Sequence, residues 1–298
     1  MTVDLLEKRK VFDRFLNQTK SDLSSYSFVN LFVWRDFFNF DFDIIDDHLC
    51  VFANNDLGSF LYLPPLGKSY SCEIIHRCFQ ELMTRNGGKG ISRIENVEKK
   101  DLDLFDDKDF IKFEKSKETI YKREDIAGLK GNCFKSKRSS YNHFLKNHNF
   151  KFHSYEESME SDCLSLYKRW AIERKKDNDD FIYHQMIDDS AFALKQSLEY
   201  YQLLGLAGKI IYVDGDISGF TFGFTLKEDT FCVLFEITDL SFRGISTYLF
   251  SEFCRSEEVK PFLFINVMDD FGLDNIGKTK LSFNPDKQVS TYTISPKD

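Results

Sequence analysis

The pattern of apolar and polar positions is clearest between Phe231 and Arg255. Phe231–Ile237 is an unbroken apolar and aromatic run, apart from Glu236, and is typical of a buried strand. A short polar connection follows, and after it apolar residues recur at helical spacing, at Ile245, Leu249, Phe250 and Phe253. The pattern predicts a strand, a turn containing Gly244 and then a helix.

A helix that begins at such a turn leaves backbone N–H groups without partners, and the helix dipole adds positive potential there. Arg243, Gly244 and Ser246 are therefore candidate ligands for the phosphate or carboxylate of a donor substrate. The alternative interpretation is an ordinary strand-to-helix connection.

Patterns along the rest of the chain predict the same order of elements twice: two helices, three strands, a helix, a strand, a short helix and a strand. This order is that of the GNAT acyltransferase fold, whose mixed sheet splays between its fourth and fifth strands. We therefore expect an α+β protein of tandem GNAT-like domains, with mixed sheets flanked by helices. The expected divisions are a supporting domain at 1–125, a basic linker helix at 126–148 and an active domain at 149–298.

The net charge of −8 argues against a general nucleic-acid binder, but the charge is uneven. Residues 112–146 hold ten Lys or Arg and four Asp or Glu, so this segment carries +6 and the remainder −14. Lys135, Lys137 and Arg138 are its candidate contacts to phosphates of a tRNA or an anionic lipid head group. The alternative is a solvated linker helix.

The spacing of cysteine and histidine residues argues against disulfide bonds and against a metal site. The seven Cys show no CxxC pair, which indicates reduced thiols and a cytoplasmic location. The six His lack metal-ligand spacing, so we expect no metal site. We also expect neither a signal peptide nor a transmembrane segment, because no apolar run approaches about 18 residues.

Six stretches, in order, resemble the C-terminal domain of phosphatidylglycerol lysyltransferases, which are related to the Fem-type aminoacyl transferases. They are SFVNLFVWRD (27–36), LPPLG (63–67), YKREDIAGLKGNCFKSKRSSYNHF (121–144), LGLAGKIIYVDGDISGFTFG (204–223), FEITDLSFRG (235–244) and INVMDDFGLDNIGKTKLSFNP (265–285). The resemblance implies a double GNAT fold and transfer of an aminoacyl group from tRNA to an amine or hydroxyl. It implies no resident cofactor, with aminoacyl-tRNA or acyl-CoA as co-substrate.

Two departures from related patterns bear on function. Acetyl-CoA enzymes of this fold have small residues where this chain has Ser246 and Tyr248, and this argues against a standard CoA site. The family commonly has an arginine where this chain has Gly277. If that arginine binds an acceptor or phosphate, one contact is lost.

Acyl transfer needs a nucleophile, a donor to the oxyanion and a route for a proton. In this fold the splayed strand supplies the backbone donor, here from Phe235–Thr238. Glu236 is the candidate base, and the alternative for it is a solvent-facing or ion-paired residue. Asp270 is the second catalytic candidate, as a group that binds a substrate amine. Lys278 and Lys280 are candidates to bind acceptor or carboxylate, or form a charged helix face.

The first half offers no second active site, because two prolines in LPPLG remove backbone donors. We expect it to support an acceptor cleft between the halves. Three functions are consistent with the sequence: aminoacyl transfer to an amine or hydroxyl, such as a lipid head group or a small molecule; N-acyl transfer from acetyl-CoA or another acyl-CoA; and binding without catalysis on the same scaffold.

Overall fold

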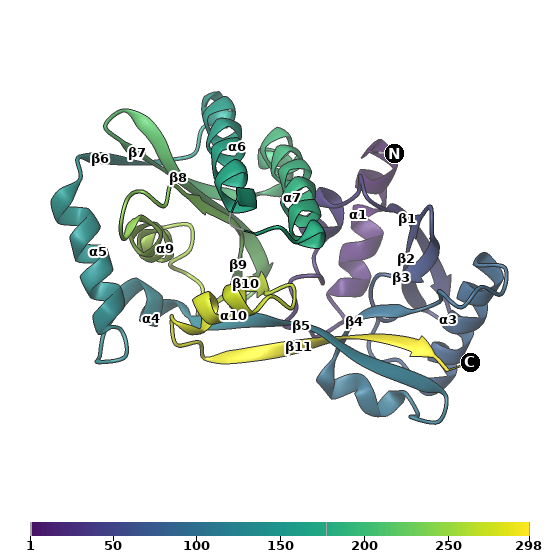
Figure 1. Cartoon of the computed structure of the whole chain (residues 1–298). Helices are drawn as coiled ribbons and strands as arrows, with labels where there is room; N and C mark the ends of the chain where they lie inside the picture. The colour runs from purple at the N-terminus through teal and green to yellow at the C-terminus, as the bar shows by residue number, and fades with distance from the viewer. Residues whose placement is uncertain (1, 177, 298) are drawn as a thin grey trace. The chain divides into compact units, whose positions relative to one another are not determined.

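The computed structural model describes residues 2–176 and 178–297. Within these ranges the chain divides into two compact units (Figure 1). The described residues up to 118, with 269–277 and 288–297, form the first unit, and residues 119–268 and 278–287 form the second.

The first unit has a sheet whose strand order is β1-β2-β3-β4-β11-β5. The strands β1, β2 and β3 are antiparallel, β4 is parallel to β3, and β11 is antiparallel to β4. The elements that lie wholly or mostly in this unit are α1 (Thr2–Leu16), α2 (Phe28–Val33), β1 (Asn39–Ile45), β2 (His48–Asn55), β3 (Gly58–Leu61), α3 (Cys72–Arg85), β4 (Ile94–Glu98), η1 (Lys99–Leu104), β5 (Phe110–Lys122) and β11 (Lys287–Pro296).

Helix α3 shows why this unit folds as predicted. Its apolar residues recur every three or four positions, so they share one face that packs on the sheet. That face carries Ile75, Cys78, Phe79 and Leu82, which join Phe52, Leu61 and Ile94 in one buried core. The LPPLG segment follows β3 and is largely buried, and Leu66 pairs with Leu49 of β2 through two backbone hydrogen bonds.

The second unit has the strand order β10-β9-β8-β7-β6. The strands from β6 to β9 are antiparallel, and β10 is parallel to β9. Its elements are α4 (Arg123–Gly128), α5 (Lys135–Asn147), β6 (Phe150–Ser154), η2 (Glu157–Met159), α6 (Glu160–Lys176), α7 (Phe181–Glu199), α8 (Tyr201–Leu204), β7 (Ala207–Val213), β8 (Asp216–Lys227), β9 (Thr230–Thr238), α9 (Ile245–Arg255) and all but the last residue of β10 (Phe264–Asp269); α10 (Asp274–Leu281) has residues in both units.

Helices cover both faces of the second sheet (Figure 1). Side chains alternate along β8, so Phe222 contacts Tyr155 and Tyr201 on the α8 side, while the Gly219 position faces Leu249 of α9. The helices α6 to α8 therefore lie on one face, and α5 and α9 on the other.

Both units contain one plan, in which three antiparallel strands (β1–β3 and β7–β9) and a helix precede a strand parallel to the last of the three, and in the second unit β6 precedes this plan. This confirms the expected α+β architecture of mixed sheets flanked by helices. The sequence suggested consecutive domains divided at 125 and 148, whereas the compact units interleave: two C-terminal stretches, 269–277 and 288–297, belong to the first. The expected linker is α4 and α5, which pack within the second unit.

Candidate active site

The strands β9 and β10, at one end of the second unit's strand order, part after a short paired stretch. Their parallel pairing covers only Thr230–Cys232 and Phe264–Asn266. Beyond it, the carbonyls of Val267 and Met268 accept hydrogen bonds from Lys280 Nζ, at 2.8 and 3.1 Å. A side-chain ammonium thus satisfies the backbone acceptors that a neighbouring strand satisfies in an unbroken sheet.

An irregularity in β9 accompanies this split. The register between β8 and β9 shifts where Val233 pairs with Gly223 and Phe235 pairs with Phe222, so Leu234 is an extra residue without a partner in β8. Such a bulge bends its strand and changes the direction of the following side chains. Glu236 follows directly and pairs with Thr221.

Glu236 lies in surroundings of low polarity. Its side chain is partly exposed, yet desolvation raises the pKa of the carboxyl to about 8, and the nearby Lys137 ammonium opposes this shift. No hydrogen bond or ion pair reaches the carboxyl from residues in the described ranges. The paired residue Thr221 is fully buried, and its hydroxyl has no hydrogen-bond partner among those residues either. Of these two groups, the partly exposed Glu236 carboxyl is the one that a substrate can reach with a hydrogen bond.

Lys137 approaches this region from α5. Its Nζ donates a hydrogen bond to Ser282 Oγ at 2.7 Å and lies 3.5 Å from the centre of the Phe283 ring. Desolvation lowers the pKa of Lys137, while the Glu236 carboxylate acts in the opposite direction. Lys137, predicted as a phosphate contact, is therefore half-buried beside the candidate base.

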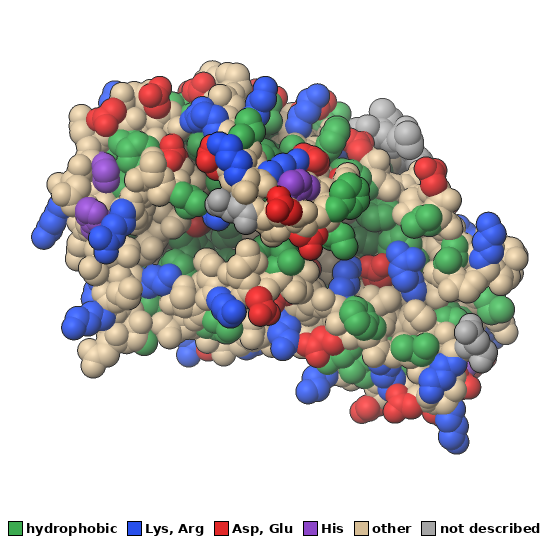
Figure 2. Space-filling view, viewed as in Figure 1, with side chains coloured by type: hydrophobic (Ala, Val, Ile, Leu, Met, Phe, Trp, Pro, Cys, Tyr) green, Lys and Arg blue, Asp and Glu red, His purple; other side chains and the backbone are tan. Residues whose placement is uncertain are grey.

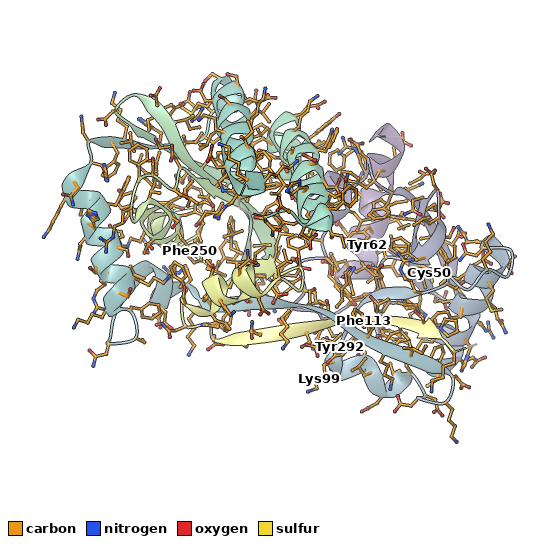
Figure 3. All side chains as sticks on the ribbon, viewed as in Figure 1. Cys50, Tyr62, Lys99, Phe113, Phe250 and Tyr292 are labelled. Carbon is orange, nitrogen blue, oxygen red and sulfur yellow. The ribbon has the colours of Figure 1, made fainter. Side chains whose placement is uncertain are left out.

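Aromatic side chains enclose the same region. Tyr121 contacts the rings of Phe250 and Phe283, and its hydroxyl donates to Lys280 O at 2.7 Å. Phe250, on α9, is labelled in Figure 3. Burial, with a contribution from Glu236, raises the pKa of Tyr121. The cluster therefore links the base, the split edge of β10 and the end of β5 in one layer of the second unit.

The start of α9 has a different environment from the one predicted. Gly244 has φ 91°, and a Cβ on it would lie 2.1 Å from the backbone oxygen of Ser140 in α5. Tyr248 stacks on Tyr141 of α5 at 5.1 Å between ring centres, and also packs on Phe144. A carbonyl oxygen beside the helix start disfavours a phosphate there.

Of the other residues predicted at this helix start and on the linker, some are exposed to solvent and one supports the fold through hydrogen bonds. Arg243 is exposed and Ser246 partly exposed. Arg138 donates from its guanidinium to the carbonyls of Leu129 and Gly131 and so supports the loop before α5. Lys135 is exposed on α5, where Lys and Arg side chains stand at the edge of the molecule (Figure 2).

Asp270 and Gly277 belong to the first unit, whereas Glu236 belongs to the second. Asp270 Oδ1 accepts from the backbone N–H groups of Lys117 and Gly272, at 3.1 and 3.0 Å, so this carboxylate holds a turn. A Cβ at Gly277 would lie 3.4 Å from Asp270 Oδ2. A longer side chain at position 277 would therefore start next to this carboxylate.

The two lysines of α10 differ in exposure. Lys280, partly exposed, donates to the carbonyls at the split edge of β10, as described above. Lys278 is exposed. The sequence did not indicate which of the two faces the sheet, because both positions fit a charged helix face.

Sequence reasoning also missed a pocket of about 540 Å³ beside the end of β9. One wall is α6, with Arg169, Trp170 and Arg174, and the other is the segment Thr238–Ser241. The available signal was an aromatic residue among basic ones, WAIERKK, at the end of a helix. No group of side chains in 2–176 or 178–297 is arranged to hold a metal ion. No helix in those ranges combines the length and apolarity that a membrane crossing requires.

The repeated plan with a split sheet defines a protein of the tandem GNAT class. A tandem GNAT protein from the clavulanic acid biosynthesis pathway superposes with a TM-score of 0.55 at 7% identity, covering 98% of this chain and 96% of that one. L-PGS from Bacillus licheniformis superposes with a TM-score of 0.62 at 15% identity, covering 96% and 91%. A conserved protein of unknown function from Bacteroides thetaiotaomicron gives a TM-score of 0.83 at 27% identity, covering 98% and 97%.

The family model described as phosphatidylglycerol lysyltransferase, C-terminal, matches residues 16–295. The chain therefore belongs to this family, as the six motifs indicated. The comparison with curated proteins finds no match.

Proposed function

We propose that this chain is an acyltransferase that moves an aminoacyl group from tRNA to the amine or hydroxyl of a lipid head group or small molecule. The observation that carries the proposal is Glu236: a carboxyl with a pKa of about 8 beside a split sheet, without a hydrogen-bond partner in the described ranges. Near neutral pH such a group can both accept and return a proton.

The proposed chemistry uses the chain's own groups at two points. The acceptor amine or hydroxyl attacks the ester carbonyl, and Glu236 takes the proton that the nucleophile loses. The negative charge on the carbonyl oxygen is met by backbone N–H groups of β9 beyond the paired stretch, where the strand has left β10. When the intermediate collapses, the C–O bond to the ribose breaks, and Glu236 returns the proton to the leaving hydroxyl.

The start of α9 bears on the choice of donor. Acyl-CoA enzymes of this fold bind pyrophosphate there, and here α5 contributes a carbonyl oxygen and two aromatic rings at that place. This favours aminoacyl-tRNA over acetyl-CoA or another acyl-CoA. A purely binding role is disfavoured because Glu236 is not tied up in a structural hydrogen bond, in contrast to Asp270.

The test is a transfer assay with tRNA charged with labelled amino acids as donor. Phosphatidylglycerol vesicles and a small amine serve as acceptors in separate reactions, and acetyl-CoA replaces the donor in a third. We expect label to pass from tRNA to an acceptor with the wild-type chain and to fall at least about 100-fold with Glu236→Gln. Glu257→Gln, which removes a carboxylate whose side chain is 86% exposed, is the matched control. Transfer only from acetyl-CoA, or equal rates in both variants, contradicts the proposal.

A further inference from the structure

The pocket beside the end of β9 has the size of a small-molecule site. Its volume of about 540 Å³ falls within the range of roughly 300–1,000 Å³ that such sites occupy. Its walls come from α6 and from Thr238–Ser241, all within the second unit. Its lining includes the buried Leu166 and Leu240, which is 58% exposed.

The carboxylates of the pocket are already committed. Glu173 pairs with Lys176 at 2.6 Å. Asp239 Oδ1 accepts from the backbone N–H and the hydroxyl of Ser241, at 2.9 and 2.7 Å. Neither acidic group therefore needs a cationic ligand for compensation.

The arginines leave donors available. Arg169 donates to Ile217 O and Ser165 Oγ, which uses part of its guanidinium. Arg174 is partly buried, and in the described part of the chain it has no hydrogen bond or ion pair. A guanidinium presents five donors in a planar fork that matches phosphate and carboxylate oxygens. The pocket thus favours an anionic group at Arg174.

An aromatic surface lies beside that cation. The Trp170 ring lines the pocket, and Arg174 Cζ lies 5.6 Å from the centre of this ring. Single-stranded nucleotides are bound by stacking of the base on aromatic or guanidinium planes, together with charge contacts to phosphate. Trp170 and Arg174 supply both elements within one turn of α6.

We propose that this pocket binds a nucleotide, with the base on Trp170 and the phosphate at Arg174. Under the proposed function the nucleotide is the terminal adenosine of the tRNA donor, so this assignment of the source rests on that function. A free nucleotide has the same chemistry, and the experiment separates the two sources.

The test measures binding in the absence of transfer. The chain has two tryptophans, so Trp34→Phe leaves Trp170 as the only indole reporter of fluorescence. In this background we expect 5′-AMP to quench the emission and Arg174→Gln to weaken AMP binding at least tenfold, or about 1.4 kcal/mol. Adenosine, which has no phosphate, is expected to bind equally to the Trp34→Phe chain with and without Arg174→Gln. Lys168→Gln, the same loss of charge at an exposed position of α6 outside the pocket lining, is the matched control.

Failure to detect AMP binding at millimolar concentration, or an equal effect of Arg174→Gln and Lys168→Gln, overturns the nucleotide site. A short single-stranded RNA ending in adenosine then identifies the source. Binding at least as tight as that of AMP supports the tRNA end, whereas binding of AMP alone overturns that assignment. AMP binding without any transfer activity contradicts the proposed function and leaves the pocket assignment intact.

Discussion

Replacing Glu236 with glutamine changes how the stability of the protein depends on pH. The ordinary pKa of this carboxyl is 4.5, and in the folded chain it is about 8. Below pH 4.5 the carboxyl is protonated in both the folded and the unfolded chain, so the stabilisation that it provides is fully present. Between pH 4.5 and 8 the unfolded chain releases the proton while the folded chain retains it, so the free energy of unfolding falls as pH rises.

The size of this loss follows from the two pKa values. Their difference corresponds to at most about 5 kcal/mol. Because the carboxyl is partly exposed and solvent screens it, we expect about 1–3 kcal/mol. Glutamine does not ionise, so the variant lacks this dependence. Glu236→Gln should gain 1–3 kcal/mol relative to the wild-type chain between pH 5 and pH 9.

The assay is urea denaturation of the wild-type chain and Glu236→Gln at several pH values between 5 and 9, which gives the free energy of unfolding at each pH. Glu257→Gln serves as the control and should follow the wild-type curve, because its carboxylate is exposed. Parallel curves for Glu236→Gln and the wild-type chain would refute a low-polarity environment at Glu236.

Three further substitutions test the surroundings of the site. Gly244→Ala should lower the free energy of unfolding, measured by urea denaturation, by about 2 kcal/mol or more. Gly215→Ala, also at positive φ but in open space, is the control and should lower it by about 1 kcal/mol. Equal losses for the two variants contradict close packing of α5 on Gly244. Lys280→Met should cost about 2–3 kcal/mol through lost charge-assisted hydrogen bonds, and an unchanged urea midpoint contradicts this. Gly277→Arg should raise stability at low salt by up to about 1 kcal/mol through Asp270, and a salt-independent melting temperature contradicts it.

Local patterns predicted the elements of the site well. The strand expected at Phe231–Ile237 is β9, and the helix expected from Gly244 is α9. The single linker helix expected at 126–148 is two helices, α4 and α5, in the structure. These elements depend on the alternation and spacing of apolar residues within about a dozen positions, which a single sequence displays.

The surroundings of these elements depend on contacts between distant segments. The packing of Ser140 and Tyr141 on the start of α9 joins positions about a hundred residues apart, and nothing near Gly244 indicates it. The hydrogen bonds from Lys280 to β10 require the split in the sheet, which is a property of the pairing rather than of either strand. Tertiary packing therefore determines which of the predicted charges are exposed and which support the fold.

The central claim is tested most directly by the pH dependence of a single turnover of aminoacyl transfer, corrected for spontaneous hydrolysis of the donor. For the wild-type chain the rate should rise with pH and level off near pH 8, the pKa of Glu236. Glu236→Gln should be slower by at least about 100-fold and show no inflection there. A Glu236→Gln profile with the wild-type rate and the same inflection would contradict the account.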